Sequence, residues 1–238
     1  MKDLVVGIDI GGTNFRVGAV LADGSLHSWR DALIRASDGP EAGLQRITAL
    51  IEQVCADAGL WPAAIGIGST GPVDRIRGAI MNPYTLPTWE DVDIVTPLSR
   101  RFGVPVVLEN DADAAALGEA WMGAGRDMKR MLMVTVGTGI GTAVILNGQI
   151  YRGYADAHPE GGHIPLDPSG PECYCGARGC WESLAGGPAI GEYARTLVVQ
   201  HPNSLLLQMV GNDIEKIDAA LVADAARNND PAALQVVE

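Results

Sequence analysis

One arrangement of residues occurs twice in this chain: a short apolar strand, a turn of glycine and threonine, and a second strand. The first turn lies within Asp9–Thr13, and the second lies within Thr135–Thr142. Short apolar runs separated by glycine are typical of strands joined by tight turns. The recurrence predicts two related α/β domains, residues 1–108 and 109–238, with a cleft between them.

The spacing of apolar residues predicts strands and helices that alternate along most of the chain. The expected strands span residues 4–10, 15–21, 64–68, 104–108, 130–136 and 142–146. The expected helices span residues 41–58, 90–101, 111–122, 188–199 and 213–227. Residues 156–182 are rich in Gly, Pro and Cys and show little periodicity, which predicts irregular structure there.

The charge balance argues against two classes of partner. The 238 residues include 17 basic and 29 acidic side chains, a net charge of −12 with no run of Lys or Arg. Binding to nucleic acid or to an anionic membrane would normally require a basic patch. No apolar run approaches the roughly 18 residues that span a bilayer, and we expect no secretory signal. We therefore expect a cytoplasmic protein that binds neither nucleic acid nor membrane.

Both glycine turns have the composition of a phosphate-binding loop. Glycine lets the backbone approach a phosphate and present N–H groups to it, and threonine adds a hydroxyl donor. The residues concerned are Gly11, Gly12, Thr13 and Asn14 in the first turn and Thr138 and Gly139 in the second. Asp9, at the end of the first strand, is suited to hold Mg²⁺ directly or through water. The alternative is a pair of plain hairpins, since short glycine motifs are weak signals.

Asn110 and Asp111 lie where a predicted strand passes into a predicted helix. A carboxylate at such a junction can take the proton from an attacking hydroxyl, and one base that orients the nucleophile is the usual protein contribution to phosphoryl transfer. The alternative is that Asp111 serves only as the helix N-cap.

A third group of residues has the composition of a closed metal site. His163, Cys173, Cys175 and Cys180 offer one imidazole and three thiolates. Four such ligands complete a tetrahedral zinc site and leave no open position, so we expect a structural zinc ion. The alternative is three unrelated buried cysteines.

Two glutamates flank the expected zinc site. A metal that holds both segments would also position the carboxylates of Glu160 and Glu182, which are good acceptors for sugar hydroxyls. The alternative for each is a solvated surface glutamate. Trp89 either packs beside a sugar ring or belongs to the core, and His158 has no evident partner in the sequence.

These motifs together resemble those of the ROK family, which comprises bacterial sugar kinases and related repressors. The resemblance covers residues 9–182, and its parts are Asp9–Thr13, Asn110-Asp111, Gly137–Gly141, Glu160–His163 and the three clustered cysteines. The segment from His163 to Cys180 is the most specific part.

The resemblance implies an actin-like, RNase H-like fold in which ATP and a hexose bind in the cleft between two α/β domains. It implies Asp111 as the general base, with Asn110, Glu160, His163 and Glu182 as sugar contacts. His163 would then serve both the zinc ion and the sugar. Phosphorylation at the 6-hydroxyl and assembly as a homodimer are further expectations.

Two features depart from the family pattern. Asp113 stands where the family often has Asn, near the expected sugar site. Kinases of the family also continue well beyond 238 residues, so we expect an incomplete chain. Two alternative functions are a sugar-responsive repressor, whose helix-turn-helix would precede Asp9, and a sugar-binding module without kinase activity.

Overall fold

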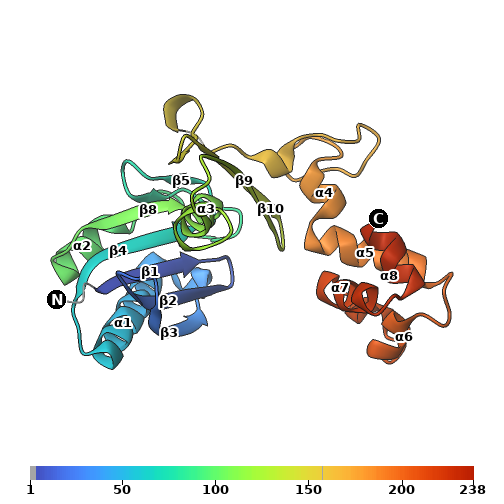
Figure 1. Cartoon of the computed structure of the whole chain (residues 1–238), viewed down its shortest axis with the longest axis horizontal. Helices are drawn as coiled ribbons and strands as arrows, with labels where there is room; N and C mark the ends of the chain where they lie inside the picture. The colour runs from blue at the N-terminus through green and yellow to red at the C-terminus, as the bar shows by residue number, and fades with distance from the viewer. Residues whose placement is uncertain (1–3, 157) are drawn as a thin grey trace. The chain divides into compact units, whose positions relative to one another are not determined.

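A computed structural model of the chain, shown in Figure 1, describes residues 4–156 and 158–238. The chain forms two compact units. The first unit extends to residue 133 and includes residues 143–158, and the second comprises residues 134–142 and 159–238. These bounds differ from the predicted domain division after residue 108, which remains a prediction.

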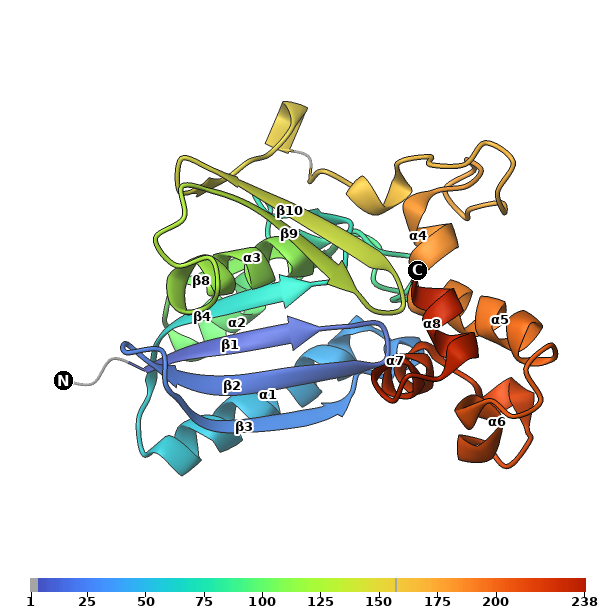
Figure 2. The same cartoon turned by 45° about the vertical axis from the view of Figure 1, so that its right-hand side comes forward.

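A five-stranded mixed sheet organises the first unit (Figure 2). The strands follow the order β3-β2-β1-β4-β8, in which β1, β4 and β8 are parallel and β2 is antiparallel to both neighbours. Their bounds are β1 Leu4–Ile10, β2 Asn14–Leu21, β3 Leu26–Leu33, β4 Pro62–Ser69 and β8 Val106–Asn110. All the strands predicted in this part of the sequence are present, and the mixed sheet agrees with the predicted α/β class.

Two helices cover one face of this sheet. Helix α1 (Pro40–Ala58) and helix α2 (Val95–Phe102) share one hydrophobic core with alternate residues of β1. The buried residues of β1 are Leu4, Val6, Ile8 and Ile10. A strand turns successive side chains to opposite faces, so this alternation directs the apolar half of β1 to the helices. A small sheet of β5 (Val73–Asp74), β6 (Ala79–Ile80) and β7 (Val92–Asp93) completes this side.

Helix α3 (Asp111–Met122) lies on the opposite face of the sheet. It begins directly after β8, and its Ala114 methyl group lies 3.1 Å from the position that a Cβ would take on Gly68 of β4. Ala112 and Ala116 of α3 form a second cluster with Ala143 and Ile145. This packing places α3 in the first unit, which explains why the unit does not end at residue 108.

Three strands follow α3 in the chain. They are β9 (Arg130–Val136), β10 (Ile140–Leu146) and β11 (Gln149–Ile150), in the order β11-β10-β9. β9 and β10 meet at the second glycine turn, as the sequence predicts.

Short helices around their own apolar core form most of the second unit. The α-helices are α4 Trp181–Ala185, α5 Gly187–Val198, α6 Leu205–Met209, α7 Ala219–Arg227 and α8 Pro231–Val237. The core residues include Ala194, Val198, Leu206 and Val222. Where the structure describes it, the segment from residue 151 to residue 180 contains only isolated bridges and the 3₁₀ turns at Tyr154–Asp156 and Gly161–His163, in agreement with its lack of periodicity. Among the described residues, no helix combines the length and the apolar character needed to cross a membrane.

The predicted helix over residues 90–101 is wrong in its first part, because α2 begins only at Val95. Asp91 has a φ of 60°, a left-handed conformation that does not continue a right-handed helix. The Asp93 carboxylate then accepts the Thr96 N–H at 2.9 Å, which ties the chain down just before the helix. The backbone conformation of Asp91 and the contact of Asp93 therefore make the helix begin later in the chain than the apolar spacing predicts.

The predicted helix over residues 213–227 is wrong in a similar way. Ile214–Lys216 forms one 3₁₀ turn, and α7 begins at Ala219. The Asp218 carboxylate accepts the Leu221 N–H at 2.9 Å and caps α7, so the periodic stretch is split at this aspartate.

We expect Gly43→Ala to destabilise the first unit. A Cβ at Gly43 of α1 would meet the indole ring of Trp89, which is fully buried and cannot move aside without disturbing the core. Overpacking of this kind costs about 1 to 3 kcal/mol, measurable as a lower urea midpoint. Gly118→Ala on α3 is the matched control: Gly118 is exposed with open space around its Cβ position, so this change should raise stability slightly. Equal midpoints for the two variants would contradict the prediction.

Candidate active site

Parallel pairing places three strand ends at one edge of the first unit's sheet. Ile10 of β1 lies opposite Ser69 of β4, and Ser69 lies opposite Asn110 of β8. The first glycine turn therefore leaves the sheet at the same edge as the Asn110-Asp111 junction. Ligands of open α/β sheets commonly bind at the carboxyl ends of parallel strands.

The first glycine turn is tight and exposed. The Gly11 N–H donates to the Asn14 carbonyl oxygen at 2.9 Å, while Gly12, Thr13 and Asn14 are open to solvent. A Cβ at Gly12 would lie only 3.0 Å from the Thr85 carbonyl oxygen, so this position favours glycine for steric reasons. The turn predicted to bind phosphate thus has accessible backbone.

Asp9 stands beside this turn with its carboxylate in solvent. It forms an ion pair with Arg16 at 3.2 Å, in which both side chains are more than half exposed, at 55% and 66%. An exposed pair of this kind contributes little stability. The Asp9 carboxylate therefore remains available to a cation that binds with phosphate.

A buried amide supports the loop that packs against Gly12. Asn82 is fully buried, and its Nδ2 donates to Thr85 Oγ1 at 2.7 Å while its Oδ1 accepts the Thr85 N–H at 3.0 Å. Trp89, further along this loop, is also fully buried. Of the two roles considered for Trp89, the structure supports the core residue and not the sugar contact.

Asn110, not Asp111, is the N-cap of α3. Its Oδ1 accepts the Ala112 N–H at 2.9 Å and the Asp113 N–H at 3.3 Å. Asp111 follows as the first helical residue and is exposed to solvent. Its Oδ1 also accepts the Ala112 N–H, at 2.8 Å. Capping is therefore accounted for without Asp111, whose carboxylate lies in the first turn, where the helix dipole favours a negative charge.

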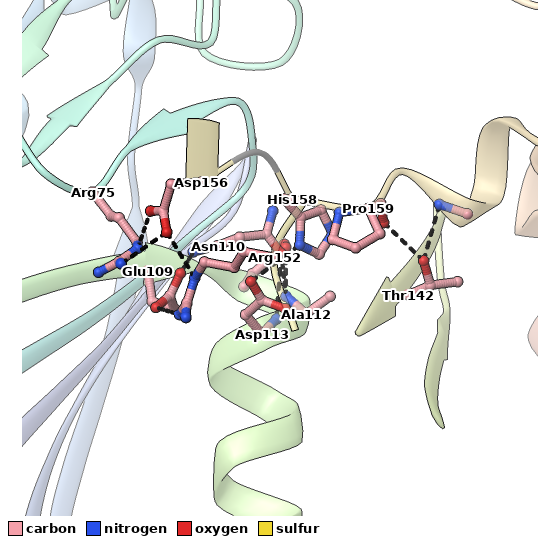
Figure 3. Close-up of polar contacts among 12 residues, drawn as sticks. Arg75, Glu109, Asn110, Ala112, Asp113, Thr142, Arg152, Asp156, His158 and Pro159 are labelled. Atoms are coloured by element: carbon pink, nitrogen blue, oxygen red, sulfur yellow. Dashed lines mark hydrogen bonds and ion pairs between the residues drawn. The ribbon is translucent and has the colours of Figure 1, made fainter. Parts of the chain in front are cut away.

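A group of charged residues surrounds the first turn of α3 (Figure 3). Asp113 is only 1% exposed at its side chain and forms an ion pair with His158 Nδ1 at 3.1 Å. His158 thus has a partner, which the sequence did not reveal because the two residues are far apart in the chain.

Two arginines extend this group of charges. Arg152 contacts Glu109, and Arg75 contacts Asp156 (Figure 3). The hydrogen bond from Arg75 lowers the pKa of the Asp156 carboxyl group and raises that of the guanidinium. Sequence reasoning singled out Glu109 only as the neighbour of Asn110 and missed Arg75, Arg152 and Asp156, since none of these three belongs to a recognisable motif.

The second glycine turn, in the second unit, is held by Glu182 of α4. Glu182 Oε2 accepts the Ile140 N–H at 2.7 Å, and the same carboxylate occupies the space that a Cβ on Gly139 would need. The Gly187 N–H donates to the Gly137 carbonyl oxygen at 2.8 Å. The predicted phosphate-binding residues Thr138 and Gly139 are therefore linked to the helix that carries a predicted sugar contact.

The four predicted metal ligands lie together in the second unit. One ligand atom from each of His163, Cys173, Cys175 and Cys180 lies within 4.8 Å of every other. Cys175 Sγ is 3.6 Å from Cys180 Sγ, and Cys173 Sγ is 3.5 Å from His163 Nδ1. Zinc bonds of about 2.3 Å to sulfur and 2.0 Å to nitrogen separate neighbouring ligand atoms by about 3.3 to 3.8 Å. These two separations match those of a zinc site, so the chemistry of the four residues fits the ion.

The protonation of the thiols also bears on metal binding. Without a metal ion, burial raises the pKa of the Cys180 thiol to about 12, whereas the Ala177 backbone N–H lowers that of the Cys175 thiol. A bound cation favours thiolates, so zinc would relieve the cost of burying Cys180.

The remaining predicted contacts fall into two sets. Asn110 and Asp111 belong to the first unit, and Glu160, His163 and Glu182 belong to the second. The Glu160 carbonyl oxygen accepts the His163 N–H at 3.1 Å, so these two residues share one 3₁₀ turn. Glu160 is exposed, as its alternative interpretation also expected.

Comparison with known proteins places these features in one family. The model of the ROK family matches residues 5–238. The chain is 38% identical over 234 residues to the glucokinase of Thermotoga maritima, an alignment that covers 98% of this chain and 72% of the relative. It is also 38% identical over 126 residues to the xylose repressor of Bacillus subtilis, covering 53% of this chain and 32% of the repressor.

A solved structure shows the same fold. The crystal structure of a ROK family glucokinase from Streptomyces griseus, in complex with glucose and AMPPNP, has a TM-score of 0.83 and 33% identity, and the match covers 98% of this chain and 74% of that one. The predicted α/β, actin-like fold class is therefore confirmed. With a family match over nearly its whole length, the chain belongs to the ROK family.

Proposed function

We propose that this chain is an ATP-dependent hexose kinase of the glucokinase type. The observation that carries the proposal is the junction of β8 and α3, where Asn110 caps the helix and Asp111 supplies a carboxylate at the edge from which the first glycine turn also leaves the sheet. The similarity to two glucokinases supports it. Use of ATP is consistent with a cytoplasmic protein.

In the proposed reaction, Asp111 is the general base. Its carboxylate accepts the proton of a sugar hydroxyl, we propose the 6-hydroxyl, while that oxygen forms a bond to the γ-phosphorus of ATP. The bond from this phosphorus to the bridging oxygen breaks, and ADP leaves. The positive end of the α3 dipole favours a negative charge at this position, and the fixed first turn orients the carboxylate.

Backbone groups are proposed to bind the phosphates of ATP. The N–H groups of the exposed residues Gly12 and Thr13, together with the turn at Thr138 and Gly139, would donate to phosphate oxygens. Asp9 would hold Mg²⁺, which usually takes one or two protein carboxylates along with phosphate oxygens. Mg²⁺, when bound, neutralises charge on the transferred phosphate.

Zinc is proposed to be structural. His163, Cys173, Cys175 and Cys180 would hold it with no open position, and the ion would supply rigidity to the surrounding loop. Glu160, His163 and Glu182, all in or beside this loop, are proposed to bind sugar hydroxyls, with Asn110 as a further contact.

A second candidate function is sugar sensing without turnover, and the similarity to a xylose repressor over 53% of the chain favours it specifically. Such a protein would bind a sugar with the same groups and would not consume ATP.

Turnover separates the two functions. With Mg²⁺ and ATP, we expect ADP release that depends on one of six sugars: glucose, fructose, mannose, allose, N-acetylglucosamine and N-acetylmannosamine. The assay should be run on this chain and on a chain extended to the length of the family kinases. Sugar binding with no ADP release from either chain would contradict the kinase and favour the sensing function.

We expect Asp111→Asn to lower kcat by about 100-fold or more, because general-base catalysis typically contributes at least this factor. Sugar binding, measured by calorimetry, should remain detectable. Asp127→Asn is the matched control: Asp127 is exposed, and its φ of 64° is a conformation that asparagine also tolerates. Retention of most activity in Asp111→Asn would refute the assignment of the base.

Metal analysis of the purified protein should find about one zinc ion per chain, and Cys175→Ser should lose it. Removal of zinc should increase hydrogen exchange in residues 160–182 and weaken sugar binding, because the ion holds the segments that carry Glu160 and Glu182. Cys55→Ser changes a buried cysteine of α1 outside the cluster and should retain the metal. Purified protein without zinc would argue against the site.

A further inference from the structure

The hydroxyl of Tyr174 lies beside the metal cluster and contacts His163. Tyr174 stands between two proposed zinc ligands, Cys173 and Cys175, in the sequence. Its hydroxyl is 3.0 Å from His163 Nε2, and the two rings meet edge to face with centroids 5.0 Å apart. The other ring nitrogen, Nδ1, is 3.5 Å from Cys173 Sγ. The two nitrogens of His163 therefore have different neighbours.

The direction of the hydrogen bonds follows from metal chemistry. A histidine binds zinc through a nitrogen that carries no proton, so a neutral His163 that uses Nδ1 as a ligand carries its proton on Nε2. Nε2–H then donates to the Tyr174 oxygen. Metal-bound histidines usually donate their second N–H to a polar group, which fixes the orientation of the ring.

Tyr174 also contacts Glu182. Its hydroxyl forms a side-chain hydrogen bond with Glu182. An ionised carboxylate can only accept, so the Tyr174 O–H donates to Glu182.

Glu182 ends the series at the second glycine turn. As described above, its Oε2 accepts the Ile140 N–H at 2.7 Å, directly after Gly139. The series therefore runs from the thiolate cluster through His163, Tyr174 and Glu182 to the backbone of a proposed phosphate-binding turn. All of these residues belong to the second unit.

We propose that Tyr174 is a positioning residue that orients His163 on zinc and holds Glu182 for sugar binding. The proposal rests on the function proposed above, since that function assigns sugar binding to Glu182. With Nδ1 on zinc and Nε2–H on the Tyr174 oxygen, a sugar contact of His163 would use this same N–H. The tyrosine is 70% exposed, so its ring does not belong to the core. Removal of the hydroxyl should therefore affect orientation more than stability.

Tyr174→Phe tests this role with the loss of a single oxygen atom. We expect zinc transfer to a chromogenic chelator to be about 10-fold faster than in the wild type, because loss of a hydrogen bond to a metal ligand typically weakens metal sites by about 10- to 100-fold. We also expect KM for the sugar to rise by about 10-fold while kcat stays within about 3-fold. Tyr193→Phe, on α5 outside the cluster, makes the same change and should leave both quantities unaltered.

The outcomes separate this proposal from the kinase function. If the wild type turns over a sugar and Tyr174→Phe leaves zinc transfer and KM unchanged, the proposal is overturned and the kinase stands. A lower KM in Tyr174→Phe also overturns it, because the hydroxyl would then compete with the sugar. If the wild type shows no turnover, the kinase fails, and the zinc transfer rate still tests the contact with His163. Faster transfer in Tyr174→Phe alone supports the orienting role, and equal rates in the two variants overturn it.

Discussion

The parallel pairing of β1, β4 and β8 is the constraint on which the first unit depends. It brings Ile10, Ser69 and Asn110 to the same level, so a glycine turn and a capped helix leave the sheet at one edge. Apolar residues on one face of β1 secure this arrangement by packing against α1 and α2. The sheet register alone brings the Asp111 carboxylate to the same edge as the glycine turn proposed to bind phosphate.

Regular elements with strong periodicity could be predicted from the sequence. β1 and α3 have the predicted bounds, since an apolar strand ending in Gly11-Gly12 and an alanine-rich helix after Asn110 each have clear local signals. The start of α2 could not be predicted, because it depends on the left-handed conformation of Asp91 and on the Asp93 carboxylate that accepts the Thr96 N–H, which override apolar spacing.

The candidate site divides in the same way. The gathering of His163 with three cysteines was predictable, because these residue types within one short segment are typical of metal ligands. The ion pair of Asp113 with His158 was not, since only tertiary structure brings a helix and a distant loop together. The hydroxyl of Tyr174 was equally hidden, because a tyrosine between two cysteines looks like any exposed aromatic residue.

Glu182 has a consequence for how this sequence can vary. Its carboxylate occupies the volume that a side chain at position 139 would require, and it also accepts the N–H of the next residue. The glycine at position 139 is therefore required by a protein carboxylate as well as by any phosphate that the turn binds. Substitutions at the two positions should not be independent, because a larger residue at 139 becomes tolerable only when the side chain at 182 is shortened. The residues at positions 139 and 182 should therefore covary.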